Sequence, residues 1–401
     1  MLLASLIVMV LLADMPIASA APGGAEQEAA PPAASGETPF DRQGIWIWYV
    51  DRSDGGDPAQ IAAQAKRAGI GTLYIKAGDG GTVWSQLNRS LVGALHKRGL
   101  DVCAWQFVYG DNPVAEAKVG ATAVRRGADC LAIDAEGDYE GKYASADRYI
   151  RALRARIGEG FPLSLAGFPY VDYHPSFPYS VFLGPEGATV DQPQMYWKAI
   201  GTTVSTVYEH TYLYNRLWGH PVYPLGQTYG GAARRDIVRF RRFAQSYGGQ
   251  APSWWDWQET SNAGWSALGA PLESPTLGYR PVVSQPLLKR GSSGDLVVWA
   301  QEHLQAAVTP GLPATGIFGK RTGAAVRAFQ EEEGLPVNGA LTTPTWSSLL
   351  NFDPVRPRWA GRRAKRGERG GAAASRARPP RRPLSASLPA VADEISPGPA
   401  P

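Results

Sequence analysis

Several residue types and segment types are scarce in this 401-residue sequence. It has five histidines and two cysteines. The histidines are scattered, and no histidine or cysteine stands at the spacing of a zinc site. No serine or cysteine has a plausible base beside it, so a metal-dependent amidase or a nucleophilic peptidase is not favoured. We therefore expect neither a metal nor a cofactor.

Long apolar segments are also absent, except at the N-terminus. The apolar run from Met1 to Ala13 is too short to span a bilayer, and Ala18-Ser19-Ala20 fits the small-x-small rule of signal peptidase. We expect a signal peptide over residues 1–20, secretion, and no transmembrane segment. Cys103 and Cys130 each begin a predicted buried strand, and although an exported protein can form a disulfide, we expect two core thiols.

Charge is unevenly distributed, because the net charge of +4 is the sum of +7 in the C-terminal tail and −3 in the rest of the chain. Residues 353–401 hold eleven Arg or Lys against four Asp or Glu, in a Pro-, Ala- and Gly-rich context without apolar periodicity. This composition predicts a disordered basic tail. Residues 21–39 are rich in Ala, Pro, Gly and Glu and predict a disordered lead.

Residues 40–268 alternate strand-like with helix-like runs, which is typical of a parallel sheet with crossover helices. The expected strands are residues 44–50, 72–77, 101–108, 130–136, 162–168, 190–197, 221–227 and 253–258. Eight such units predict an α/β fold, a (β/α)8 TIM barrel. An open doubly wound sheet is the alternative, but no Gly-rich phosphate loop follows the first strand.

Polar and aromatic residues cluster at the carboxyl end of every predicted strand, where such barrels build their active sites. The set comprises Asp51, Lys76, Asp79, Gln106, Tyr109, Asp134, Glu136, Tyr170, Asp172, Gln194, Tyr196, Gln227, Tyr229, Asp256 and Gln258. Inward-facing carboxyls and amides cost free energy unless they find partners, so a full ring of them indicates function.

The fourth predicted strand ends with two carboxyls, Asp134 and Glu136, two residues apart and therefore on one face. Crowding two buried carboxyls pushes their pKa values apart, which suits acid catalysis of glycosidic cleavage. The short separation favours a retaining route. We expect Glu136 to donate the proton and Asp134 to assist; Asp138 and Glu140 are alternatives in the following loop.

Aromatic and polar residues at the strand ends are expected to bind the sugar. These candidate substrate-binding residues are Trp46, Trp48, Tyr196, Trp197, Gln227, Asp256 and Trp257.

The Asp134-x-Glu136 motif, with Tyr196-Trp197-Lys198-Ala199 and Trp257-Gln258, resembles family 25 glycoside hydrolases, which are lysozymes. It partly resembles the signature of family 18 chitinases, matching at Asp129, Asp134 and Glu136. The family 25 resemblance implies a catalytic aspartate in the first strand, where this chain has Trp46. Asp51, Asp191 or Asp256 could substitute, the fourth strand could act alone, or activity could be lost.

A Pro-rich linker is expected over residues 269–286, followed by a second compact unit over 287–352. Apolar residues share helical faces at Val297, Ala300 and Leu304, and again at Ala325, Val326 and Phe329, so short helices can close a small core. With a third face at residues 346–350, this pattern predicts an all-α, three-helix domain.

This unit resembles the peptidoglycan-binding type 1 domain through Gly316-Ile317-Phe318-Gly319, Phe329-Gln330, Gly334-Leu335-Pro336-Val337-Asn338-Gly339 and Thr345-Trp346. The resemblance implies peptidoglycan as ligand. Gln301, Arg321 and Gln330 are the candidate contact residues.

The leading hypothesis is a secreted, wall-located glycoside hydrolase of lysozyme type that acts on peptidoglycan or a related N-acetylated glycan, with the small domain tethering it to its substrate. The alternative is a catalytically inactive barrel that binds or scaffolds wall glycan. We expect a monomer with no nucleic-acid partner.

Overall fold

The computed structural model describes residues 37–248, 250–272 and 282–357. The predicted signal peptide, nearly all of the predicted lead, half of the predicted linker and most of the predicted tail lie outside these described residues.

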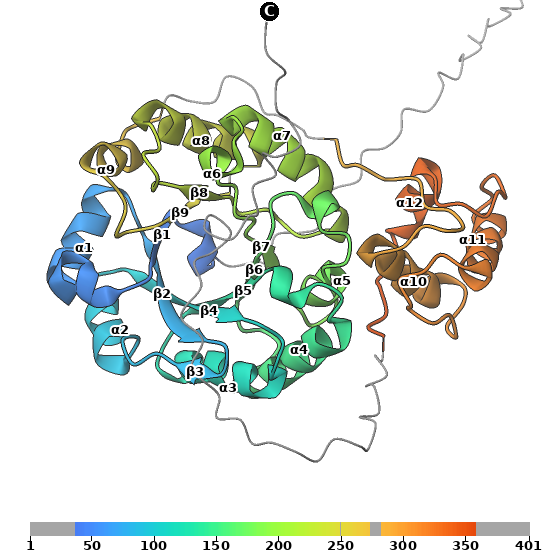
Figure 1. The fold of residues 1–401 in the computed structure, drawn as a ribbon, viewed down its shortest axis with the longest axis horizontal. Helices are drawn as coiled ribbons and strands as arrows, with labels where there is room; N and C mark the ends of the chain where they lie inside the picture. The colour runs from blue at the N-terminus through green and yellow to red at the C-terminus, as the bar shows by residue number, and fades with distance from the viewer. Residues whose placement is uncertain (1–36, 249, 273–281, 358–401) are drawn as a thin grey trace, which may run out of the picture. The chain divides into compact units, whose positions relative to one another are not determined.

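The first and larger part of the fold is a ring of parallel strands, seen end-on in Figure 1. The strands are β1 (Gly44–Ile47), β2 (Thr72–Asp79), β4 (Asp101–Val108), β5 (Cys130–Ala135), β6 (Leu163–Ala166), β7 (Val190–Asp191), β8 (Leu225–Gln227) and β9 (Ser253–Trp255). Their order is β7-β6-β5-β4-β2-β1-β9-β8. Parallel bridges Asp191↔Val222 and Gln194↔Leu225 join the two ends, so the sheet closes. The predicted (β/α)8 barrel is confirmed.

One strand was not predicted. The short β3 (Thr82–Val83) pairs antiparallel with the end of β2 and forms a hairpin there. Strand β2 is correspondingly longer than its predicted range of 72–77, because it continues through Gly78 and Asp79 into the hairpin.

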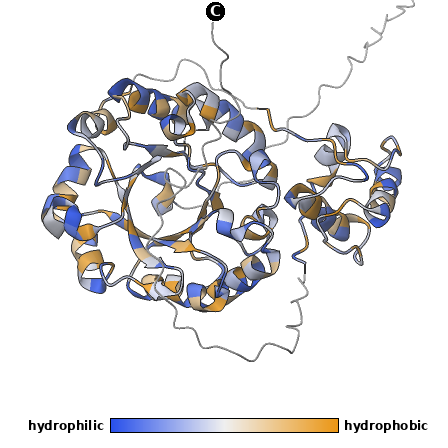
Figure 2. Ribbon diagram, in the orientation of Figure 1, coloured by the Kyte–Doolittle hydropathy of each residue, from blue (hydrophilic) through white to orange (hydrophobic). Residues whose placement is uncertain are grey.

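Helices surround the strands in Figure 1. They are α1 (Pro58–Arg67), α2 (Arg89–His96), α3 (Pro113–Arg125), α4 (Tyr143–Ile157), α5 (Tyr179–Phe182), α6 (Trp197–Ile200), α7 (Val204–Tyr214), α8 (Arg234–Tyr247) and α9 (Asn262–Leu268). Helix α1 shows the local logic: the Asp57 side chain caps the amide of Ala59, Pro58 begins the helix, and Ile61 lies on the buried face. Figure 2 shows hydrophilic colouring along the outer side of this ring.

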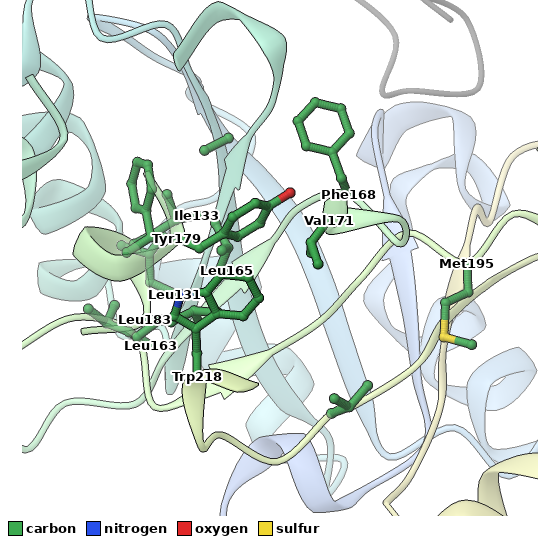
Figure 3. Close-up of a cluster of buried hydrophobic side chains, with 14 of the residues drawn as sticks. Leu131, Ile133, Leu163, Leu165, Phe168, Val171, Tyr179, Leu183, Met195 and Trp218 are labelled. Carbon is green, nitrogen blue, oxygen red and sulfur yellow. The ribbon is translucent and has the colours of Figure 1, made fainter. Parts of the chain in front are cut away.

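Alternation along each strand separates two apolar layers. Leu131 and Ile133 of β5, with Leu163 and Leu165 of β6, belong to the layer between the strands and the helices, which Figure 3 shows beside Phe168, Val171, Tyr179, Leu183, Met195 and Trp218. The intervening residues Cys130 and Ala132 belong instead to the interior of the barrel. A residue two positions further along β5 therefore also faces the interior.

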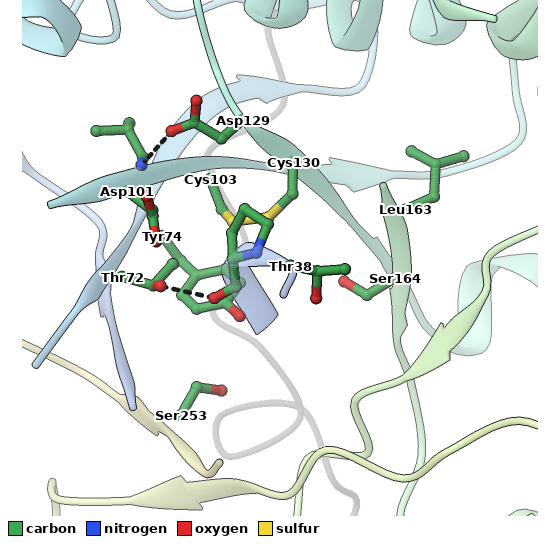
Figure 4. The surroundings of a disulfide bond; sticks show 12 residues. Thr38, Thr72, Tyr74, Asp101, Cys103, Asp129, Cys130, Leu163, Ser164 and Ser253 are labelled. Carbon is green, nitrogen blue, oxygen red and sulfur yellow. Dashed lines mark hydrogen bonds between the residues drawn. A yellow bond between two sulfur atoms is a disulfide. The ribbon is translucent and has the colours of Figure 1, made fainter. Parts of the chain in front are cut away.

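The barrel interior is mostly aromatic and contains a disulfide. Cys103 of β4 and Cys130 of β5 are partners in the strand register, with their Cα atoms 4.5 Å apart, and their sulfurs are bonded (Figure 4). The prediction of two free thiols was wrong. The register pairs the third residue of β4 with the first residue of β5, which places the two cysteines within bonding reach.

The C-terminal module has three helices, α10 (Asp295–Ala307), α11 (Lys320–Glu332) and α12 (Thr343–Leu349), as predicted. Its core includes Val297, Val326, Phe329 and Trp346. None of the helices in the described ranges is both long and apolar enough to cross a membrane.

Two glutamines fix the loops of the module. Gln301 accepts hydrogen bonds from the amides of Thr315 and Gly316, at 2.7 and 3.0 Å. Gln330 accepts in the same way from Asn338 and Gly339, at 3.0 and 2.9 Å. Both side chains are buried and occupied by these loops, so of the predicted ligand contacts only Arg321 remains exposed.

Candidate functional site

The carboxyl ends of the strands bring together two acids from β5 and an amide that follows β7. Asp134 and Glu136 share the inward face of β5 with Cys130 and Ala132, and they are only 1% and 5% exposed. Gln194 Nε2 donates to Asp134 Oδ1 at 3.2 Å and to Glu136 Oε1 at 3.0 Å. One amide group thus fixes both carboxyls in the mouth of the barrel.

The electrostatics of this pair favour retention of a proton. Burial, and secondly the charge of Glu136, raise the pKa of Asp134 well above its ordinary value, while the charge of Lys76 opposes the rise. Because two crowded carboxyls resist joint ionisation, the pair retains a proton at pH values where an exposed carboxyl has lost it. This is the state that an acid catalyst needs.

A buried ammonium group balances the acids. Lys76 Nζ lies 2.8 Å from Asp79 Oδ2, and Tyr109 donates its hydroxyl to the other oxygen of Asp79, also at 2.8 Å. The same Nζ lies 4.5 Å from the ring centre of Trp105, 4.9 Å from that of Trp84 and 5.2 Å from that of Trp48. Burial lowers the pKa of Lys76 and the charge of Asp79 opposes this, so an ion pair and three aromatic rings replace the water that the cation has lost.

Two more of the predicted residues are Tyr196, on which the charges of the pair act, and Asp256, whose charge also acts on Tyr196. Burial, followed by the charges of Tyr229, Asp134 and Glu136, raises the pKa of Tyr196 well above its ordinary value. The Tyr196 hydroxyl is buried and has no hydrogen-bond partner among the described residues, which leaves a donor for a ligand. Asp256 is buried and accepts a hydrogen bond from the amide of Glu259 at 3.1 Å.

Four predicted substrate-binding residues lie elsewhere. Trp46 is deep in the barrel interior, stacked on Tyr74 at 4.8 Å. Trp197 and Trp257 pack against the helix layer, their rings 5.2 Å from Phe240 and 4.7 Å from Trp265.

Gln227 is the fourth, and its oxygen accepts hydrogen bonds from the amides of Lys198 and Ala199, at 2.7 and 3.1 Å, so it holds the α6 turn. The choice of Trp197 and Trp257 is corrected because both come after their strands have ended and their side chains turn toward the helices. Of the aromatic candidates, Tyr196 is within the influence of both acids, and Trp48 contacts Lys76.

The three possible substitutes for the missing first-strand aspartate are also separated. Asp191 faces the helix layer, where it accepts a hydrogen bond from Asn215 Nδ2 at 3.1 Å, and burial raises its pKa to about 7. Asp51 is exposed on the rim. Asp256 is the one of the three whose charge, like those of Asp134 and Glu136, acts on Tyr196.

Sequence reasoning missed the aromatic enclosure of Lys76. Neither Trp105, which lies inside the expected strand 101–108, nor Trp84 is among the predicted site residues. The signal available was alternation: Trp105 is two residues after Cys103, on the inward face of β4. No comparable signal pointed to Trp84, because its place depends on the β2–β3 hairpin.

The fold and the site define the class: a (β/α)8 barrel protein with a buried pair of carboxyls at the carboxyl ends of its strands. The module is identified more narrowly, because residues 293–349 match the family model described as a putative peptidoglycan binding domain. The solved N-terminal domain of SleB is 35% identical over 17% of this chain and 93% of that domain, with a TM-score of 0.17. No curated protein matches the chain in sequence.

Two further solved structures match part of the chain at low identity. The Bacillus cereus spore cortex-lytic enzyme SleL is 11% identical, over 57% of this chain and 74% of that one, with a TM-score of 0.41. A family 25 glycosyl hydrolase from Bacillus anthracis is 14% identical, over 39% of this chain and 71% of that one, with a TM-score of 0.28. At these scores the chemistry must be argued from this chain's own residues, and the family 25 resemblance stays a hypothesis.

Proposed function

We propose that this protein is a secreted glycoside hydrolase that cleaves peptidoglycan or a related N-acetylated glycan, held on the wall by its C-terminal module. The observation that carries the proposal is the buried Asp134–Glu136 pair, bridged by Gln194 at the mouth of the barrel. The match of residues 293–349 supports peptidoglycan as the target.

In the proposed reaction, Glu136 is the acid. It is the more exposed carboxyl of the pair and follows the last residue of β5, so it lies nearer the opening. Glu136 gives its proton to the glycosidic oxygen as the bond from that oxygen to C1 breaks. Burial and the charge of Glu136 raise the pKa of Asp134, and the charge of Lys76 opposes this rise. In the proposed reaction the proton of the pair resides on Glu136, so Asp134 is ionised and stabilises positive charge on the substrate.

The second half of the reaction restores the enzyme. In a retaining route, either a carboxylate or the oxygen of the substrate's own acetamido group bonds to C1 as the leaving group departs. With the acetamido group, Asp134 orients and stabilises its nitrogen. Water then attacks C1 and yields its proton to Glu136, so the sugar gains a hydroxyl with the original configuration.

The proposal is tested by the chemistry of the products released from purified peptidoglycan. A glycosidase generates new reducing ends without new amino groups, whereas an amidase or peptidase generates amino groups. We expect reducing ends only, and release of amino groups without reducing ends would contradict the proposal.

A second candidate function, a barrel that binds wall glycan without cleaving it, is favoured by one observation. Lys76, Asp134 and Gln194 are at most 2% exposed, and Trp46 occupies the position of the first-strand aspartate. Sedimentation with insoluble wall, without release of either product, would support this candidate.

A further inference from the structure

A cleft that the proposed reaction does not use lies at the carboxyl ends of β1 and β2. Its volume is about 430 Å³, and it is lined by Tyr49, Asp51, Val83, Trp84, Ser85 and Gln86. One wall comes from the turn after β1 and the other from the hairpin and loop after β2. It therefore opens on the same end of the barrel as the acid pair.

The walls of this cleft are held firmly. Gln86 Nε2 donates to the carbonyls of Trp48 and Lys76, at 2.8 and 2.9 Å, and its oxygen accepts from the amide of Val50 at 3.1 Å. Arg126 Nη1 donates to the carbonyl of Trp84 at 2.8 Å. A preformed wall loses little entropy when a ligand binds, which favours a binding role.

Two aromatic rings line the cleft. Tyr49 and Trp84 are half-buried, with ring centres 5.6 Å apart and planes tilted by 37°. On its buried side Trp84 contacts Lys76, whose charge acts on both Asp134 and Glu136. Trp84 thus lines the cleft and also borders the charged cluster of the site.

We propose that this cleft is a sugar subsite that receives a neutral pyranose ring of the glycan chain, stacked on Trp84. Tyr49, whose ring is stacked on Trp48 and contacted by Arg52, forms the side wall. Aromatic faces complement the C–H faces of a pyranose. The exposed carboxylate of Asp51 and the hydroxyl of Ser85 stand at the rim, where they can bond sugar hydroxyls or an acetamido N–H. The identification of the sugar as part of wall glycan rests on the proposed function.

The test measures binding rather than hydrolysis. The full chain carrying Glu136→Gln is titrated calorimetrically with a soluble oligomer of N-acetylglucosamine, alone and with Trp84→Ala added. We expect Trp84→Ala to weaken binding by about tenfold, the equivalent of about 1.4 kcal/mol. Trp84→Phe, which keeps a ring, should retain most of the affinity.

Trp265→Ala in the same background is the matched control. Trp265 is a half-buried tryptophan of α9 that packs on Trp257, and we expect its loss to change affinity less than about twofold. Thermal melts of each variant exclude unfolding as the cause. Affinity that is unchanged by Trp84→Ala, or no binding of the oligomer by the Glu136→Gln chain, would overturn the subsite.

These outcomes separate the subsite from the proposed function. Binding that depends on Trp84 in a chain whose parent releases no reducing ends would uphold the subsite and contradict the glycosidase. Release of reducing ends by the parent, with normal binding by Trp84→Ala, would support the glycosidase and contradict the subsite.

Discussion

At the scale of single residues, the mouth of the barrel is organised by charge balance. Asp79, Asp134 and Glu136 supply carboxyls, and Lys76 supplies the opposing charge while it is fully buried. An isolated buried charge lowers the stability of the folded state. The ion pair of Lys76 with Asp79 and the hydrogen bonds from Gln194 offset this loss. Truncating one member should therefore affect the others as well.

The buried carboxyl of Asp191 yields a stability prediction. Its folded-state pKa is raised from 3.8 to about 7, so the folded state favours the neutral form. The free energy of unfolding therefore falls progressively as the pH rises from about 4 to about 7, and above about pH 7 the reduction is complete. Asp191→Asn removes this penalty, and its new amide faces Asn215, whose Oδ1 has no partner in the described part of the chain.

We expect Asp191→Asn to raise the free energy of unfolding by about 2–4 kcal/mol at pH 8 and by little at pH 4. Denaturant melts at both pH values measure this. Asp54→Asn, an exposed carboxylate in a loop, is the control and should not change with pH in this way. An equal effect of Asp191→Asn at pH 4 and pH 8 would contradict the account.

At the scale of elements, the link between β4 and β5 matters because Asp134 and Glu136 are carried by β5. The Cys103–Cys130 disulfide joins two residues that are 27 positions apart in the sequence, and the loop that it closes contains α3. Such a crosslink reduces the conformational freedom of the unfolded chain. It should therefore stabilise the very strand on which the acids lie.

Replacing both cysteines by alanine should lower the free energy of unfolding by about 3–4 kcal/mol, from the loop that is no longer closed. Denaturant unfolding of the oxidised parent and of the double variant measures it. Parent protein treated with reductant after unfolding should behave like the variant. Equal stability of the variant and the oxidised parent would mean that the two sulfurs are not bonded.

At the scale of elements, part of the fold and of the candidate site could be predicted from the sequence. The barrel could be predicted from the alternation of strand-like and helix-like runs, and the inward direction of Asp134 from two-residue alternation along β5. Glu136 is the first residue after β5 and still points the same way, since both carboxyls bond Gln194. The disulfide did not follow, because it depends on the register between two strands. The positions of Trp197 and Trp257 did not follow either, because both come after their strands have ended, where alternation no longer fixes direction.

At the scale of the whole molecule, two parts have separable tasks. The barrel carries the proposed chemistry, and the module carries the matched peptidoglycan-binding sequence. A module that holds the protein on an insoluble wall raises the local substrate concentration without adding a contact at the acid pair. Damage to the module should therefore affect wall association more than chemistry.

Gln330→Ala tests this separation. Gln330 is buried in α11 and bonds to Asn338, Gly339, Ala340 and Thr345, so its loss leaves part-buried loop amides unpaired at a cost of about 1–3 kcal/mol to the module. We expect weaker sedimentation with insoluble wall and unchanged cleavage of soluble glycan fragments. Gln305→Ala, a half-buried glutamine of α10, is the control, and equal wall binding by both variants would contradict the assignment.

The most direct test of the central claim, that the acid pair cleaves glycan, is release of reducing ends from purified peptidoglycan by the parent and two matched variants. Glu136→Gln removes the proposed acid, and Glu140→Gln removes an exposed carboxylate four residues later that bonds His174 and Ser176. We predict a loss of about 100-fold or more for Glu136→Gln and a change of less than about threefold for Glu140→Gln. Parent-like activity in Glu136→Gln, or a loss confined to Glu140→Gln, would contradict the account.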